Sequence, residues 1–164
     1  MKVVFLDRDG VINKKIENSY VLDWKGFKFL PDVDKAIKLL NEKEIPVFVI
    51  SNQACVGKGL ITADKLNDIN NRMVKELGSK GAWIDDVFVC PHKKEDNCDC
   101  RKPKTGLFMQ AKEKYPNIEF SDSWFIGDSL EDVEAGKSAG TSTYLLKNGE
   151  SLKSVVENIL KEWK

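Results

Sequence analysis

Short apolar runs alternate with amphipathic stretches along this chain. The apolar runs predict strands at residues 3–6, 47–50, 87–90, 124–126 and 141–146, of which the first two are expected to be buried. Apolar residues with helical spacing predict helices at 33–40, 66–77, 107–112 and 152–160, and a helix rich in small residues that ends near 139. Strands that alternate with helices are typical of an α/β fold with a mostly parallel sheet covered on both faces.

Polar residues stand directly after several of these strands. Asp7 and Asp9 follow the first strand, Ser51 follows the second, and Asp128 follows the fourth. Ligands bind at the carboxyl ends of the strands in parallel sheets, so these side chains are expected to meet at one edge. Residues two apart on an extended backbone share a face, and two carboxylates held close repel each other unless a cation or a shared proton intervenes. The pattern therefore favours a chemical site over solvated turns.

Phosphoryl transfer suits these residue types. A carboxylate such as Asp7 can attack phosphorus and form an aspartyl-phosphate. A Mg²⁺ ion held by Asp7, Asp128 and a backbone carbonyl near Asp9 would relieve the charge repulsion, since Mg²⁺ prefers oxygen ligands. Asp9 could protonate the leaving group and then activate water. The neighbouring Asp7 and the bound phosphate would raise the pKa of Asp9 and the metal would lower it, a balance that the sequence leaves open. Ser51 and Lys102 are the candidate phosphate donors.

Four motifs together resemble one family. FLDRDG, a strand that ends in SNQ, the lysine of CRKPKTG, and IGDSLED are similar to the haloacid dehalogenase superfamily of phosphotransferases. The resemblance spans residues 3 to about 146. It implies a Rossmann-like α/β core and Mg²⁺, with Asp7 as nucleophile and Asp9 as acid and base. It also implies that Ser51 and Lys102 hold the phosphoryl group, that Asp128 holds the metal, and that Asp132 supports the metal site.

A second metal motif lies between the third strand and the next helix. The pattern C-x-H-x5-C-x-C supplies three thiolates and one imidazole, which are a complete tetrahedral set for a structural Zn²⁺. Its members are Cys90, His92, Cys98 and Cys100. His92 is the single histidine of the chain, which excludes His-based catalysis. Four unrelated side chains are the weaker interpretation, because three cysteines and a histidine lie within eleven positions. A zinc-bound loop would also direct the next two residues, Arg101 and Lys102, towards the phosphate site.

This loop narrows the resemblance to small phosphatases that lack a full cap. That branch includes enzymes that act on D-glycero-D-manno-heptose 1,7-bisphosphate and enzymes that act on histidinol phosphate. The five-residue spacer after His92 is similar to the histidinol-phosphate enzymes, whereas residues 20–21, 27–30 and 57–62 look more like the heptose enzymes. The two similarities to the heptose enzymes outweigh the one spacer length, so the 7-phosphate of the heptose bisphosphate is the expected substrate. The expected substrate-binding residues are Tyr20, Asn52, Gln53 and Arg101, with Arg101 suited to a distal phosphate.

Length and composition describe an ordinary soluble protein. The 164 residues predict a single phosphatase domain over 1–164. Lys plus Arg and Asp plus Glu both number 26, so no net field favours nucleic acid or an anionic membrane. No apolar run approaches the roughly 20 residues of a membrane span, and no signal-peptide core is present. We expect a cytoplasmic monomer with reduced thiols, a small phosphorylated substrate, and no nucleic-acid or membrane partner.

Three alternatives are less consistent with the sequence. A zinc-stabilised binding module would not need Asp7, Asp9, Ser51, Lys102 and Asp128 together. A DNA 3′-phosphatase shares the chemistry but requires a basic groove, which zero net charge disfavours. A phosphomutase needs a cap to exclude water, and the stretch between residues 10 and 30 is too short for a cap domain.

Overall fold

A five-stranded parallel sheet forms the centre of the molecule. The structure is a computed structural model and describes residues 1–163. The strand order is β3-β2-β1-β4-β5, and every neighbouring pair is parallel. The strands are β1 (Val4–Leu6), β2 (Val47–Asn52), β3 (Asp86–Cys90), β4 (Trp124–Gly127) and β5 (Ser142–Leu145). Each of the five predicted strands is therefore confirmed.

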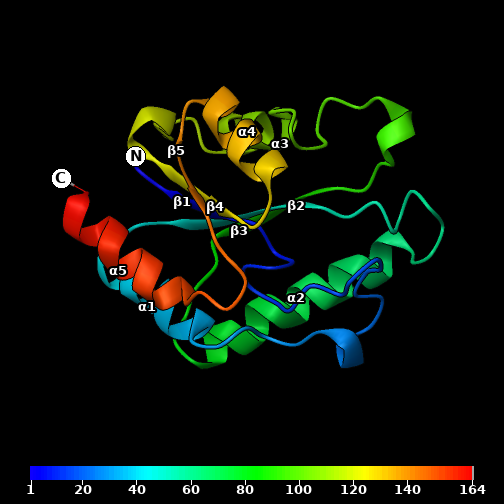
Figure 1. The fold of residues 1–164 in the computed structure, drawn as a ribbon, viewed down its shortest axis with the longest axis horizontal. Coiled ribbons are helices and arrows are strands. Elements are labelled where there is room, and N and C mark those ends of the chain that lie inside the picture. The colour runs from blue at the N-terminus through cyan, green and yellow to red at the C-terminus, as the bar shows by residue number, and fades with distance from the viewer. Residues whose placement is uncertain (164) are drawn as a thin grey trace.

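Helices cover both faces of this sheet. The helices are α1 (Val33–Glu42), α2 (Ala63–Ser79), α3 (Gly106–Lys114), α4 (Leu130–Ala139) and α5 (Leu152–Glu162). Three short 3-10 turns are η1 (Trp24–Gly26), η2 (Lys94–Asp96) and η3 (Phe120–Asp122). In Figure 1, α3 and α4 lie above the sheet, and α1, α2 and α5 lie below it. The predicted three-layer α/β sandwich is confirmed.

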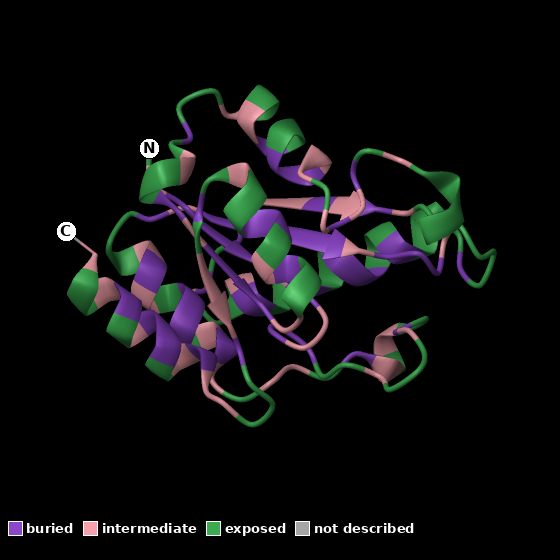
Figure 2. Cartoon of the chain, turned by 45° about the horizontal axis from the view of Figure 1, so that its top comes forward, coloured by how far each residue is buried: buried purple, intermediate pink, exposed green. Residues whose placement is uncertain are grey.

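The alternation of side chains along the strands divides the core in two. In β1, Val4 and Leu6 pack with the apolar faces of α1, α2 and α5, while Phe5 packs on the opposite face with α3. The rings of Phe5 and Phe108 meet edge to face with their centroids 5.1 Å apart. Figure 2 shows the central strands and the inward faces of the helices as buried, whereas β5 at the edge of the sheet is exposed or intermediate. With both faces covered, the strand ends and their loops carry the polar chemistry.

Three loops leave the sheet at the carboxyl ends of the strands. Residues 53–62 and 91–105 lie at the right-hand end of the molecule in Figure 1, and residues 10–30 pass below α2 towards this end before they return to α1. Strand β2 is two residues longer than predicted, because Ser51 and Asn52 pair with β3. The 14–30 segment is irregular apart from η1 and a bridge between Asn13 and Phe29. Within residues 1–163, no helix is both long and apolar enough to span a membrane.

Candidate active site

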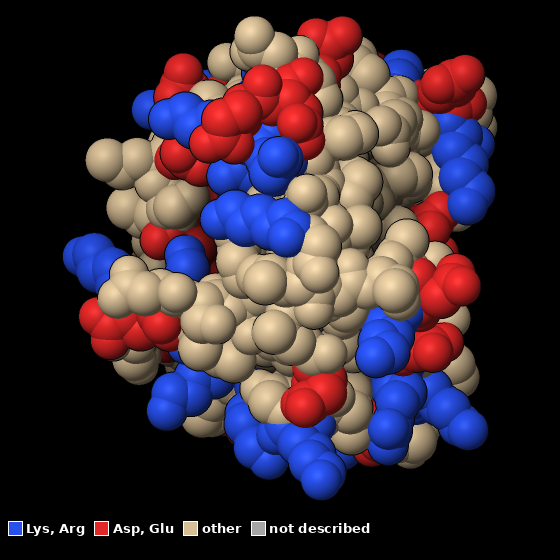
Figure 3. Space-filling view, turned by 90° about the vertical axis from the view of Figure 1, so that its right-hand side faces the viewer, with Lys and Arg blue, Asp and Glu red and all other residues tan. Residues whose placement is uncertain are grey.

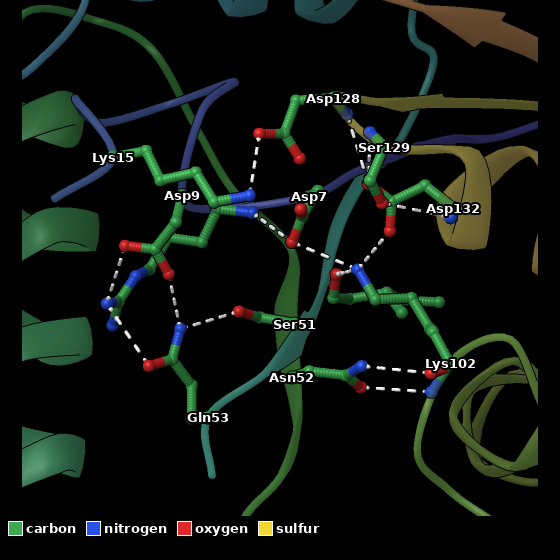
Figure 4. A network of polar contacts seen from close by, with 12 residues as sticks. Asp7, Asp9, Lys15, Ser51, Asn52, Gln53, Lys102, Asp128, Ser129 and Asp132 are labelled. Atoms are coloured by element: carbon green, nitrogen blue, oxygen red, sulfur yellow. Dashed lines mark hydrogen bonds and ion pairs between the residues drawn. The ribbon is translucent and has the colours of Figure 1, made fainter. Parts of the chain in front are cut away.

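Most of the predicted residues meet in one cavity at this edge of the sheet, whereas Ser51 and Gln53 are buried outside its lining. Asp7 follows β1, Asp128 follows β4, and Lys102 comes from the loop after β3. The cavity is lined by residues that include Asp7, Asp9, Tyr20, Arg101, Lys102 and Asp128. Figure 4 shows the carboxylates of Asp7 and Asp128 and the ammonium of Lys102 directed towards the centre of the group.

Two glycines allow the acidic side chains to approach the backbone. Gly10 has φ +88°, and a Cβ atom at this position would lie 2.1 Å from an Asp128 carboxylate oxygen. A Cβ atom at Gly127 would lie 2.2 Å from the Cβ of Asp132. Only a residue without a side chain fits either position. The glycine of the DRDG motif therefore makes room for a carboxylate from another strand.

Lys102 is the buried cation of the site. Its Nζ lies 3.0 Å from Asp7 Oδ1 and 2.6 Å from Asp132 Oδ1, and it donates to the Ile50 carbonyl at 3.1 Å. Burial disfavours the charged amine, but Asp7 and Asp132 together raise the pKa of Lys102 above its ordinary value. The ammonium has three donors, and each of them has a protein acceptor here. Lys102 therefore acts first on the two carboxylates, and a phosphoryl oxygen would have to share one of its donors.

Asp7 lies in an environment that opposes its ionisation. Burial raises the pKa of Asp7 well above its ordinary value, Lys102 opposes this, and the charges of Asp132 and Asp128 add to the rise. Oxygen atoms of Asp7, Asp128 and Asp132 all lie within 4.8 Å of one another. Three carboxylates around one buried lysine leave negative charge in excess, and an all-oxygen donor set suits Mg²⁺. Lys15 adds a more exposed cation, with its Nζ 3.1 Å from Asp128 Oδ2.

Asp9 also lines the cavity, but its carboxylate accepts hydrogen bonds from a separate set of donors. Asn13 Nδ2 donates to Oδ1 at 2.9 Å, Arg8 NH2 donates to the same oxygen at 3.2 Å, and Gln53 Nε2 donates to Oδ2 at 2.6 Å. Burial favours the neutral acid, yet the Arg8 charge and these hydrogen bonds together lower the pKa of Asp9 below its ordinary value. Among the protein groups alone, the carboxylate form of Asp9 is favoured. Both carboxylate oxygens of Asp9 already accept hydrogen bonds, so the group that Asp9 can offer to a metal is its backbone carbonyl.

The three residues of the SNQ motif have different contacts. Ser51 Oγ accepts a hydrogen bond from Gln53 Nε2 at 2.7 Å. The Asn52 amide pairs with the backbone of Lys102, accepting from its N–H at 3.0 Å and donating to its carbonyl at 3.1 Å. Asn52 thus holds the lysine loop as well as lining the cavity, whereas Gln53 is buried behind Asp9 and outside the cavity lining. Of the expected substrate-binding residues, Tyr20, Asn52 and Arg101 line the cavity.

The cysteine and histidine motif forms a compact cluster next to the cavity. Cys90 Sγ lies 3.6 Å from Cys98 Sγ and 3.0 Å from Cys100 Sγ, and His92 Nδ1 lies 3.2 Å from Cys100 Sγ. Zn–S bonds of about 2.3 Å imply sulfur separations of roughly 3.8 Å in a tetrahedral site, so the cluster has nearly these dimensions. Burial and the neighbouring sulfurs raise the pKa of Cys100, an effect that a bound cation reverses. The four residues fit a structural Zn²⁺.

Several residues of the site were missed by the sequence reasoning. Lys15 and Ser129 line the cavity, and Arg8 and Asn70 are buried behind Asp9. Two of these residues, Arg8 and Asn70, could have been recognised from the sequence. Arg8 is a charged residue between two aspartates at the end of a buried strand, and Asn70 is a polar residue within the apolar stripe of α2. Lys15 stands in a stretch without periodicity, so its contact with Asp128 depends on the tertiary fold.

The outer surface around this edge carries both signs of charge. Figure 3 shows lysine, arginine, aspartate and glutamate side chains in mixed groups around an uncharged centre. A nucleic-acid substrate requires a continuous basic surface.

Comparisons with known proteins agree with this geometry. A family model for HAD-hydrolase-like proteins matches residues 99–162. The D-glycero-alpha-D-manno-heptose-1,7-bisphosphate 7-phosphatase of Mycobacterium bovis is 40% identical over 131 residues, which cover 80% of this chain and 69% of that protein. The D-glycero-beta-D-manno-heptose-1,7-bisphosphate 7-phosphatase of Bordetella bronchiseptica is 32% identical over 162 residues, which cover 99% and 89%. A crystal structure of the B. bronchiseptica D,D-heptose 1,7-bisphosphate phosphatase with magnesium and phosphate has a TM-score of 0.92 and 31% identity over 99% of both chains.

The chain therefore belongs to the haloacid-dehalogenase-like phosphatases, as its motifs predict. Within that family, the relatives named above are heptose-1,7-bisphosphate 7-phosphatases, and they include enzymes named for the α anomer and for the β anomer.

Proposed function

We propose that this protein hydrolyses the 7-phosphate of D-glycero-D-manno-heptose 1,7-bisphosphate. The observation that carries the proposal is the placement of Asp7, Asp9, Lys102 and Asp128 around one cavity in a chain whose curated relatives bear that activity in their names. Arg101 lines the same cavity and suits a second phosphate, because a guanidinium can bind two phosphate oxygens at once. A bisphosphate fits this arrangement better than a monophosphate such as histidinol phosphate.

Hydrolysis proceeds in two steps on the chain's own residues. A carboxylate oxygen of Asp7 attacks phosphorus, the ester P–O bond breaks, and Asp9 gives a proton to the leaving alkoxide. The negative charge of the bound phosphate opposes the lowered pKa of Asp9 and favours the protonated form that this step requires. Asp9 then takes a proton from water as the water attacks the phosphorus of the aspartyl-phosphate, which releases phosphate and restores Asp7. Lys102 balances negative charge on Asp7, and Ser51 offers its hydroxyl to a phosphoryl oxygen. Donors of this kind contribute on the order of 10²–10³ in rate.

Two metals accompany this proposal. Asp7, Asp128 and the backbone carbonyl of Asp9 would hold Mg²⁺, with Asp132 behind them, and the ion would neutralise charge on the phosphoryl oxygens. The fit rests on the three carboxylates gathered within 4.8 Å. Zn²⁺ would be held by the cluster in the loop after β3, formed by Cys90, His92, Cys98 and Cys100. Its closed ligand set suits a structural role.

Phosphate release tests the proposed substrate directly. The α and β anomers of heptose 1,7-bisphosphate and histidinol phosphate should be compared side by side in Mg²⁺. We expect the heptose bisphosphate to have the higher kcat/KM. A higher value for histidinol phosphate would reverse the assignment.

A single substitution tests the nucleophile. Asp7→Asn should abolish phosphate release because the neutral amide cannot form the aspartyl-phosphate. Circular dichroism should show the same fold as the unsubstituted protein. Retained turnover in the folded variant would exclude Asp7 as the nucleophile.

A further inference from the structure

Arg8 stands between the two catalytic aspartates in the sequence, and its side chain is a fully buried charge. It has 0% exposure and lies in the space between the end of β1 and helix α2. Among residues 1–163, Asp9 is the carboxylate within ion-pair distance of its guanidinium, at 3.2 Å. Burying a guanidinium is costly, and here its Nε has no hydrogen-bond partner within the described chain. A merely stabilising role accounts poorly for a charge in this position.

Arg8 is anchored at its far end by α2. Its NH1 donates to Asn70 Oδ1 at 2.9 Å. Asn70 is 5% exposed and belongs to the buried face of a helix whose other inward residues are mostly apolar. The amide therefore fixes the direction of the guanidinium from outside the reacting groups. Neither Arg8 nor Asn70 lines the cavity.

Arg8 also decides which way the Gln53 amide is turned. Its NH2 reaches Gln53 Oε1 at 3.4 Å, so the carbonyl end of the amide faces the arginine. The NH₂ end of Gln53 then faces Asp9 Oδ2 at 2.6 Å and Ser51 Oγ at 2.7 Å. An amide has one donor end and one acceptor end, and the reverse orientation would place its oxygen against the Asp9 carboxylate. One guanidinium thus restrains both oxygens of Asp9, one directly and one through Gln53. Figure 4 shows the Gln53 amide between Asp9 and Ser51.

We propose that Arg8 and Asn70 are positioning residues that hold the Asp9 carboxyl group in the orientation for proton transfer to the leaving group. This inference rests on the proposed function, because it takes Asp9 as the acid of the first step. A displacement of about 1 Å far from the reacting atoms can lower a rate about 10²-fold. Loss of either residue should therefore reduce proton transfer while the cavity that binds the ester stays intact.

The leaving group separates this role from a structural one. An alkoxide needs a proton as the P–O bond breaks, whereas p-nitrophenolate leaves without one. The value of kcat/KM reports the first irreversible step. A variant with a misplaced Asp9 should thus lose kcat/KM for alkyl phosphates and keep most of it for p-nitrophenyl phosphate. A variant that is only less well folded should lose both in the same proportion.

The experiment compares Arg8→Met, Asn70→Ala and Asn71→Ala on heptose 1,7-bisphosphate, glycerol phosphate and p-nitrophenyl phosphate. Asn71 is the matched control, because it is an asparagine of the same helix with an exposed side chain. For the alkyl esters we expect kcat/KM to fall about 10²-fold in Arg8→Met and about tenfold in Asn70→Ala. For p-nitrophenyl phosphate the losses should be several-fold smaller, and Asn71→Ala should match the unsubstituted protein. Inhibition by orthophosphate should change less than about twofold.

Two outcomes contradict the inference. Equal losses on alkyl and aryl esters would assign Arg8 and Asn70 a structural role, and unchanged kcat/KM on the alkyl esters would remove them from catalysis. Thermal melting of each variant ensures that every assay is run on folded protein. If the unsubstituted protein hydrolyses glycerol phosphate but not the heptose bisphosphate, the substrate proposal fails. The positioning inference is then decided on the two simple esters alone.

Discussion

Breaking the buried ion pair between Lys102 and Asp132 should cost far more stability than breaking an exposed pair of the same length. Lys102 Nζ and Asp132 Oδ1 are 2.6 Å apart, and both side chains are 3% exposed. Asp132 Oδ2 also accepts from the backbone N–H groups of Asp128 and Ser129, which begin the turn into α4. Removal of either partner leaves a charge in a place that water does not reach.

The two single substitutions should differ in size. Lys102→Met leaves both Asp7 and Asp132 without their cation, so it should cost about 5 kcal/mol of unfolding free energy. Asp132→Asn leaves Lys102 paired with Asp7 and should cost about 3 kcal/mol. At roughly 2–4 °C per kcal/mol for a chain of this size, the second value corresponds to a Tm lower by about 6–12 °C. The double variant should cost about 2 kcal/mol less than the sum, because each substitution removes the partner of the other.

Urea unfolding of the four proteins at pH 7, followed by circular dichroism, measures this coupling. The control cycle is Lys153–Glu157, whose charged atoms are also 2.6 Å apart but whose side chains are 36% and 40% exposed. We expect a coupling of about 0.5 kcal/mol or less there, reduced further by 1 M NaCl, while the Lys102–Asp132 coupling persists in salt. A Lys102–Asp132 coupling no larger than the control would refute the reasoning from burial.

Two further predictions concern the cysteine and histidine cluster and the contacts of Asp86. Metal analysis should find about one Zn per chain, and Cys98→Ser with Cys100→Ser should remove it and lower the Tm; a zinc-free chain with unchanged Tm would argue against the site. Partial burial raises the pKa of Asp86, but the hydrogen bond from Lys114 and other donors lower it below its ordinary value of 3.8. Asp86 thus stabilises the fold above that value, and the deficit of Asp86→Asn in urea unfolding should shrink as the pH falls below 3.8 and through the folded pKa; a deficit that does not shrink with falling pH would contradict this.

The sequence was sufficient to predict the fold and the main acidic site. Apolar runs are strongly constrained in a sheet buried on both faces, so all five strands were recognisable. Asp7, Asp9 and Asp128 were found because they follow those runs directly. The cysteine and histidine cluster was recognisable from spacing, since a loop without apolar periodicity has few other ways to become ordered. The cytoplasmic location and the monomeric state stay predictions.

The contacts between residues far apart in sequence were not predictable. Asn52 was expected at the substrate, and the structure shows its amide paired with the Lys102 backbone, 50 residues away. The Arg8–Asn70 contact spans 62 residues and depends on the rotation of α2 about its axis. The pKa of Asp9 could not be judged from its neighbours in the chain alone, because the groups that lower it include Gln53 from the loop after β2. Periodicity fixes which face a residue occupies, but not its partner on that face.

The loop around the cysteine and histidine cluster also accounts for how a site without a cap domain keeps its rim in place. The backbone of the 53–60 turn is tied to this loop, as Gln53 N–H donates to the Cys90 carbonyl at 2.7 Å and Gly57 N–H donates to the Pro91 carbonyl at 2.9 Å. A Cβ atom at Gly57 would lie 2.7 Å from the Pro91 oxygen, so the close contact requires glycine.

From the same turn, Lys58 Nζ donates to the Tyr20 hydroxyl at 2.8 Å, which connects the 14–30 segment to it. Arg101 belongs to the loop itself and donates to the His92 carbonyl at 3.4 Å. Tyr20 and Arg101 line the cavity from separate segments, and hydrogen bonds thus connect both residues to the loop of the cysteine and histidine cluster. The order of this loop should therefore affect the binding of the distal part of a substrate as well as the stability of the fold.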